Sequence, residues 1–125
     1  MIRAMARILI IDDNTIVLET YCQMLERAGY EVVKATGGKE GTKLFRDNPT
    51  DLVITDILMP EKEGFETIIE LRRDFPDVKI IAISGGAFLS PKDYLEIAKQ
   101  FGAMRTLTKP IDQEELLEAV RKCLT

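Results

Sequence analysis

The chain has 125 residues, of which 46% are hydrophobic and 30% charged, and its net charge is −4. This length suits one globular domain and is too short for two ordinary ones, and with this composition the chain can bury a core and need not be disordered. The acidic balance, without a cluster of basic residues, argues against direct nucleic-acid binding. No apolar stretch approaches the roughly 20 residues of a membrane span. The first apolar run is short and ends at Asp12, which favours a strand over a signal peptide and predicts a cytoplasmic protein.

Five short apolar runs predict β-strands, at residues 7–11, 31–35, 52–55, 78–83 and 104–107. Three of these runs are almost continuously hydrophobic. Strands of that kind are typical of a parallel sheet whose two faces are both covered.

Helical patterns lie between the strands, at residues 15–28, 38–47 and 64–74. Ser90 and Pro91 open a fourth helix, which Gly102 closes. Asp112, with Glu115 three residues later, resembles a capping box for a last helix that extends to about Leu124. Strands that alternate with helices predict an α/β fold, a doubly wound five-stranded parallel sheet with right-handed crossovers. No linker divides residues 1–125, so we expect one domain without an output domain.

The chain contains no histidine and two cysteines. The lack of histidine excludes a catalytic triad with a histidine base and most zinc sites, so oxygen atoms must hold any metal. Cys22 and Cys123 lie far apart, each among apolar neighbours in a helical pattern. Buried free thiols are therefore favoured over a disulfide or a metal pair.

Polar residues follow the strands at the edge where ligands of such sheets bind. Asp12 and Asp13 end the first strand, Asp56 the third and Ser84 the fourth, and the fifth runs into Lys109. Each has an ordinary explanation by itself: Asp13 could cap a helix, Ser84 could begin a turn, and Lys109 could be a solvated surface residue. A parallel sheet, however, brings these strand ends into one crevice.

The expected cluster of charges indicates a chemistry. Three carboxylates so close together repel one another unless a cation intervenes, and Mg²⁺ suits a site made of oxygen ligands. With Lys109 the site could accept a phosphoryl group, whose charge is about −1.5 to −2. Aspartate can act as the nucleophile in phosphoryl transfer, and Asp56 lies centrally. Ser84 and Lys109 could then bind phosphoryl oxygens.

At these residues the chain resembles the receiver domain of two-component response regulators. The resemblance spans nearly the whole chain and rests on the Asp12-Asp13 pair, on "DILMPEKEG", on "IIAISG" and on "TKPID". It implies a flavodoxin-like (βα)5 fold with strand order 2-1-3-4-5, an order for which a chemotaxis receiver is itself a standard example. In this family the peptide bond between Lys109 and Pro110 is often cis.

The resemblance also assigns roles to the residues at the strand ends. Asp56 would be the phosphoacceptor and Lys109 would pair with the phosphoryl group. Mg²⁺ would be bound by Asp12, Asp13, Asp56 and the backbone carbonyl of Leu58. Ser84 and Thr106 would occupy the two switch positions.

Two positions depart from the family pattern. The second switch residue is commonly aromatic, but here it is Thr106, so we expect coupling to run through Ser84 and the following loop. Gly85 and Gly86 either ease movement of that loop or form a plain turn. Leu58 stands where polar residues are frequent, and its side chain cannot orient a hydrolytic water. We therefore predict an altered lifetime of the acyl phosphate.

The function implied is that of a phosphorylation-dependent signalling switch that is not an enzyme, although small phosphodonors and autodephosphorylation could act at the site. A sensor histidine kinase or a phosphotransfer protein would be the donor, and a downstream protein or a fused output domain would respond, with a phosphorylation-dependent dimer as one form of that response. The family's output face usually comprises the fourth helix, the fifth strand and the fifth helix. Four apolar residues in these elements either contribute to that face or, as is more usual at helical spacing, belong to the core: Tyr94, Ile97, Phe101 and Leu117.

Alternatives remain open at this point. The chain could be a receiver fragment of a hybrid kinase or of a longer transcriptional regulator. An aspartyl-phosphate hydrolase of the dehalogenase type would need D-x-D-x-[TV] after the first strand, whereas this chain reads "DDNTI". A nucleotide- or flavin-binding module would need a glycine-rich phosphate loop there. A degenerate receiver that is not phosphorylated disagrees with the presence of all five site residues.

Overall fold

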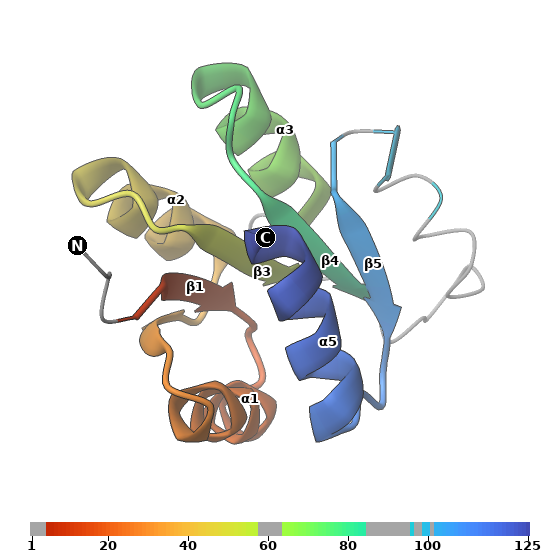
Figure 1. Cartoon of the computed structure of the whole chain (residues 1–125). Helices are drawn as coiled ribbons and strands as arrows, with labels where there is room; N and C mark the ends of the chain where they lie inside the picture. Colours follow the sequence, from red (N-terminus) through yellow and green to blue (C-terminus); the bar gives the residue numbers. More distant parts are fainter. Residues whose placement is uncertain (1–4, 58–63, 85–95, 97–98, 101) are drawn as a thin grey trace.

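The computed structural model describes residues 5–57, 64–84, 96, 99–100 and 102–125. Its five strands form one parallel sheet in the order β2-β1-β3-β4-β5, which confirms the predicted fold and strand order (Figure 1). The strands are β1 (Arg7–Ile11), β2 (Glu31–Ala35), β3 (Leu52–Asp56), β4 (Ile80–Ser84) and β5 (Arg105–Thr108).

Helices cover both faces of the sheet, as Figure 1 shows. One layer contains α1 (Thr15–Arg27) and α5 (Gln113–Leu124), and the other contains α2 (Gly38–Asp47) and α3 (Gly64–Asp74). Most of the predicted fourth helix lies outside the described residues. Among the helices that the structure describes, none is long and apolar enough to span a membrane.

The side chains of the central strands alternate between two hydrophobic cores. Ile8 and Ile10 of β1 pack in the core under α1 and α5, whereas Leu9 and Ile11 pack in the core under α2 and α3. The same alternation in β3 and β4 explains their nearly continuous hydrophobic sequences, since both faces of these strands are buried. Cys22 and Cys123 are free thiols buried in the first of these cores, as predicted.

Several element boundaries differ from the prediction. β3 continues through Asp56, so this carboxylate belongs to the strand itself. β4 begins at Ile80 instead of residue 78, because a turn in which the Val78 amide bonds the Phe75 carbonyl precedes it. β5 is shifted by one residue toward the C-terminus. At its start α1 is capped by Asn14 and not by Asp13, since the Asn14 side chain accepts hydrogen bonds from Ile16 and Val17.

Gly64 brings the start of α3 against the end of β3. Its amide donates to the Ile57 carbonyl at 2.7 Å. A Cβ at this position would collide with the Asp56 carbonyl oxygen and lie 2.5 Å from Ile57 Cα. The glycine at the end of "DILMPEKEG" is therefore required by the close approach of two backbones.

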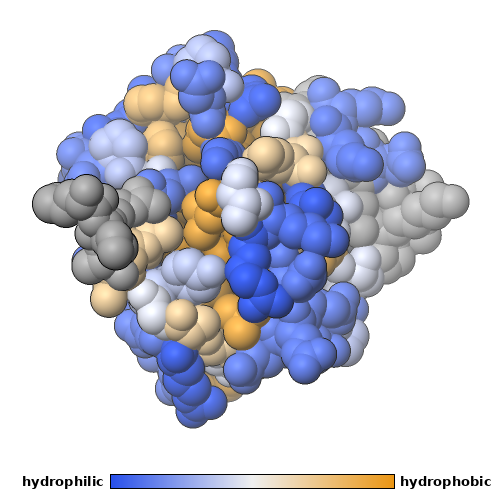
Figure 2. All heavy atoms as spheres, in the orientation of Figure 1, coloured by the Kyte–Doolittle hydropathy of each residue, from blue (hydrophilic) through white to orange (hydrophobic). Residues whose placement is uncertain are grey.

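The outer surface is mainly polar on the face that Figure 2 shows. Hydrophilic residues cover most of this view, and hydrophobic residues show chiefly between the groups of hydrophilic ones near its centre. Single exposed apolar side chains, such as Ile16 and Met104, are ordinary features of a protein surface.

Candidate functional site

Three strand ends bring three aspartates together at one edge of the sheet. Asp12 follows β1 directly, Asp13 comes next, and Asp56 is the last residue of β3. One carboxylate oxygen from each lies within 4.8 Å of the others. Asp12 and Asp56 are buried, with exposed fractions of 1% and 6%, whereas Asp13 is exposed. The predicted cluster of aspartates is therefore present, and one member of it faces the solvent.

Lys109 joins two of these carboxylates. Its Nζ donates to Asp12 Oδ2 at 3.0 Å and to Asp56 Oδ2 at 2.9 Å. Burial by itself lowers the pKa of Lys109, but the hydrogen bonds and charges of Asp56 and Asp12 outweigh it, so this pKa is raised. Lys109 therefore stays protonated at neutral pH and offsets part of the repulsion between the buried carboxylates.

The chain leaves β5 through a cis peptide between Lys109 and Pro110, as the resemblance implies. The Lys109 amide donates to the Ser84 carbonyl at 2.9 Å, which ties the lysine to the end of β4. Ser84 is fully buried at this point and pairs with Thr108 across the two strands. The structure thus places Asp12, Asp13, Asp56, Ser84 and Lys109 at one edge of the sheet.

The donor set fits a hard divalent cation. All ligands available in the cluster are carboxylate oxygens, which Mg²⁺ prefers to nitrogen or sulfur. Asp12 Oδ1 accepts a hydrogen bond from the Asn14 amide at 2.9 Å, which orients this carboxylate while its other oxygen contacts Lys109. The Leu58 carbonyl, predicted as a further ligand, lies outside the described residues.

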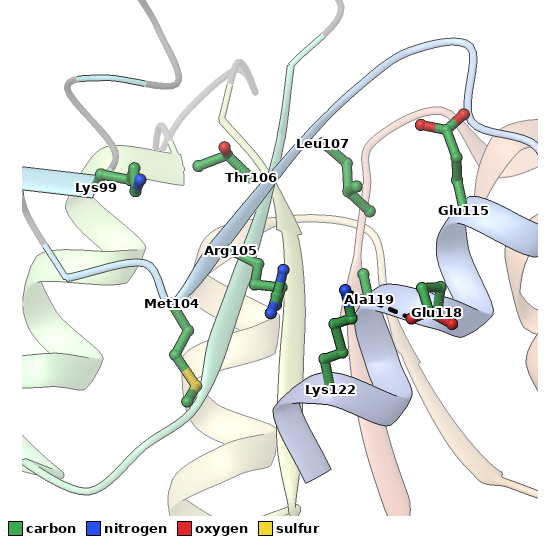
Figure 3. A pocket seen from close by; sticks show the side chains of 9 residues that line it. All are labelled: Lys99, Met104, Arg105, Thr106, Leu107, Glu115, Glu118, Ala119 and Lys122. Carbon is green, nitrogen blue, oxygen red and sulfur yellow. Dashed lines mark ion pairs between the residues drawn. The ribbon is translucent and has the colours of Figure 1, made fainter. Parts of the chain in front are cut away.

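Thr106 lies in β5, two residues before the end of the strand. It pairs with Ala82, which packs in the core under α2 and α3, and it is half-buried. Figure 3 shows the hollow of about 320 Å³ that it lines. The other lining residues of the hollow come from β5, α5 and nearby positions: Lys99, Met104, Arg105, Leu107, Glu115, Glu118, Ala119 and Lys122.

The rim of this hollow is charged. Lys122 Nζ lies 3.5 Å from Glu118 Oε1, one turn apart on α5, and Figure 3 marks this ion pair. Leu117, predicted as part of an output face or of the core, is half-buried and packs against the core under α1 and α5. Tyr94, Ile97 and Phe101, predicted in the same role, lie outside the described residues, as do Gly85 and Gly86.

One residue near the site was not recognised from the sequence as functional. Tyr21 lies within the helical pattern of residues 15–28, where the sequence indicates only a helix, but in the structure the charges of Lys109, Asp12 and Asp56 act on its phenol. Burial is the main cause that raises the pKa of Tyr21. The only sign of this in the sequence was a tyrosine hydroxyl on an otherwise apolar face of a helix, and such a hydroxyl does not by itself show that charged residues lie nearby.

Comparison with known proteins agrees with this arrangement. The family model described as the response regulator receiver domain matches residues 8–121. The protein PilH of Pseudomonas aeruginosa is 35% identical over 122 residues, which cover 96% of this chain and 98% of PilH. The DNA-binding dual master transcriptional regulator RpaA of Synechocystis is 37% identical over 120 residues, and the chain spans 49% of its length.

A solved structure shows the same likeness in three dimensions. The crystal structure of a response regulator receiver domain protein from Clostridium thermocellum superposes with a TM-score of 0.89 at 31% identity. The match covers 96% of this chain and 94% of the other. The likeness in fold therefore extends over nearly the whole chain.

Proposed function

Because the chain belongs to the family of response regulator receiver domains, which are phosphorylation-dependent signalling switches, we propose that Asp56 is its phosphoacceptor. The contact between Asp56 Oδ2 and Lys109 Nζ, at 2.9 Å inside the cluster of three aspartates, is the observation that best supports this assignment. It combines a buried nucleophile with a fixed positive charge.

The reaction is a transfer to the carboxylate. An oxygen of Asp56 attacks the phosphorus atom in line, and the bond from phosphorus to the donor breaks. The electron pair of that bond stays with the leaving group. The leaving atom is a histidine nitrogen when a kinase or phosphotransfer protein is the donor, and an oxygen when acetyl phosphate is the donor. An aspartyl phosphate results, and water later hydrolyses it.

Charge balance explains the remaining aspartates. Asp12, Asp13, Asp56 and the Leu58 carbonyl would hold Mg²⁺, which when bound supplies positive charge beside the phosphoryl oxygens. The three carboxylates supply three negative charges, against one positive charge from Lys109. Mg²⁺ would supply the remaining positive charge, so that the site could accept a negatively charged phosphoryl group.

Lys109 and Ser84 would respond to the new group. Once Asp56 is phosphorylated, Lys109 Nζ exchanges its hydrogen bond with Asp56 Oδ2 for one to a phosphoryl oxygen. The Ser84 hydroxyl, at the end of β4, would bind another phosphoryl oxygen. Thr106, beside the hollow at β5, is the second switch position and supplies no aromatic ring.

The partners follow from the family. We place the chain in the cytoplasm, with a sensor histidine kinase or a phosphotransfer protein as its donor. A downstream protein, a fused output domain or a second phosphorylated copy would recognise the changed surface. Small phosphodonors support self-phosphorylation, and the apolar Leu58 alters the rate of autodephosphorylation.

The test uses acetyl phosphate with Mg²⁺ and intact-mass spectrometry of the protein. We expect the addition of one phosphoryl group to the wild type and none to Asp56→Asn. Asp77→Asn is the matched control, because Asp77 is an exposed carboxylate in the loop between α3 and β4. Equal labelling of Asp56→Asn and the wild type would exclude Asp56 as the acceptor.

A further inference from the structure

Asn14 occupies the corner between β1 and α1, where both its side chain and its backbone are bonded. Its side-chain Oδ1 accepts hydrogen bonds from the Ile16 amide at 3.0 Å and from the Val17 amide at 3.2 Å. Its carbonyl accepts the first hydrogen bond of the helix, from the Leu18 amide at 2.9 Å. These three bonds are those of an ordinary N-cap, and they fix Asn14 against the first turn of α1.

A fourth bond of Asn14 points back to the acidic site. The Asn14 amide donates to Asp12 Oδ1 at 2.9 Å, while the other oxygen of this carboxylate accepts from Lys109 Nζ at 3.0 Å. The Asp12 backbone is also fixed, because its amide donates to the Ala35 carbonyl at 3.1 Å. Asp12 is only 1% exposed, so water does not readily replace either donor to its carboxylate. The carboxylate therefore keeps the direction that these two donors give it.

The two donors differ in how they are anchored. Lys109 reaches Asp12 through a long side chain that also donates to Asp56 at 2.9 Å. The Asn14 amide belongs to the backbone, and its position is set by the start of α1. Without the cap, water would bond the amides of the first turn of the helix, and the turn of residues 12–14 could shift. This turn also carries Asp13, so two of the three clustered aspartates depend on it.

We propose that Asn14 is a positioning residue: its side chain caps α1, and the cap holds the backbone amide that directs the Asp12 carboxylate toward Lys109 and the metal. This inference rests on the proposed function, in which Asp12 and Asp13 are ligands of Mg²⁺. Asn14 supplies no atom to the metal or to the phosphoryl group. It acts only through the turn of residues 12–14, which carries the two aspartates.

The test compares Asn14→Ala with Asn14→Ser. Both variants keep the backbone amide that bonds Asp12, but only the serine variant can still cap the helix. We expect Asn14→Ala to raise the dissociation constant for Mg²⁺ about threefold to tenfold in isothermal titration, and Asn14→Ser to stay within about twofold of the wild type. Gln23→Gly is the matched control, because Gln23 is exposed within α1, where glycine weakens the helix and leaves the cap intact.

A second measurement needs neither metal nor phosphodonor. Amide hydrogen exchange, followed by nuclear magnetic resonance, gives the protection factor of the amide at position 14 after correction for the side chain present. We expect this protection to fall at least about threefold in Asn14→Ala and to stay near the wild-type value in Asn14→Ser and Gln23→Gly. Such a pattern would mean that the hydrogen bond to Asp12 depends on the cap and not on the general stability of α1.

The outcomes are distinct. A wild-type affinity for Mg²⁺ in Asn14→Ala, an equal loss in Gln23→Gly or no recovery in Asn14→Ser would each overturn the positioning role. Unchanged protection of the amide in Asn14→Ala would overturn it as well. Absence of both Mg²⁺ binding and phosphorylation in the wild type would instead overturn the proposed function. In that case the protection factors would still decide whether the cap at Asn14 holds the bond to Asp12.

Discussion

Lys109 Nζ lies 2.9 Å from Asp56 Oδ2, although the two residues are 53 positions apart in the chain. The same nitrogen lies 3.0 Å from Asp12 Oδ2, so one ammonium group neutralises part of the charge of two buried carboxylates. This pairing lowers the free-energy cost of burying the two carboxylates. It also places a positive charge where a phosphoryl group on Asp56 would lie.

Removal of that ammonium group should destabilise the protein. We expect Lys109→Met to lower the free energy of unfolding by about 3 kcal/mol at pH 7 without Mg²⁺, because two buried carboxylates lose their shared cation. Lys34→Met is the control: Lys34 pairs with Glu19 at 3.0 Å on the surface, and its loss should lower the free energy of unfolding far less. Urea unfolding measures both, and equal losses would contradict the importance of the buried pair.

Asp13 offers a way to weaken the proposed metal site without disturbing the core, because it is the exposed member of the cluster. Asp13→Asn should weaken Mg²⁺ binding by about tenfold or more, since an amide replaces a charged ligand. The stability without metal should change little. Isothermal titration with Mg²⁺ gives the affinity, with Asp77→Asn as the control. Unaltered affinity in Asp13→Asn would remove this residue from the metal site.

Gly64 should be intolerant of any side chain. We expect Gly64→Ala to lower the free energy of unfolding by about 1–3 kcal/mol, because the new Cβ meets the backbone of Asp56 and Ile57, which cannot rotate away as a side chain would. Gly37→Ala is the control, since nothing lies within 4 Å of a Cβ there. Urea midpoints of the two variants compare them directly, and similar midpoints would show that α3 can shift away from β3.

Cys22 should make stability fall at alkaline pH. Burial raises the pKa of Cys22 to about 12, from an ordinary value of 9.0. Its folded-state pKa therefore lies above that of the unfolded chain, and the stability it contributes is complete below pH 9 and is lost as the pH rises toward 12. Between pH 9.5 and 11 the unfolded chain releases a proton that the folded protein retains, which costs about 1.4 kcal/mol per pH unit.

Replacement of this thiol isolates its contribution. In reducing buffer, the free energy of unfolding of Cys22→Ala should fall less steeply with pH than that of the wild type, whatever the absolute cost of the smaller side chain. The comparison uses slopes because Tyr21 and Cys123, whose pKa values burial also raises, contribute equally to both proteins. If the free energy of unfolding fell equally steeply with pH in both proteins, burial would not raise the pKa of the Cys22 thiol.

Much of this protein was determined by local patterns in the sequence. Continuous apolar runs such as Ile8–Ile11 predict strands buried on both faces, because helices must cover both sides of a parallel sheet. Polar residues directly after such runs then identify the edge where Asp12, Asp56 and Ser84 meet. The strand order and the roles of these residues came from the resemblance to receiver domains, and the structure confirms the order.

Only the tertiary structure decided the contacts between distant segments. The structure also decided one local choice, the cap of α1: it is Asn14 and not Asp13, because the Asn14 side chain is the one that accepts from the Ile16 and Val17 amides. Both carboxylates bound by Lys109 and the backbone that excludes a side chain at Gly64 belong to other elements of the fold. Periodicity reports which face of an element is buried, whereas these distances exist only once the sheet has brought the elements together.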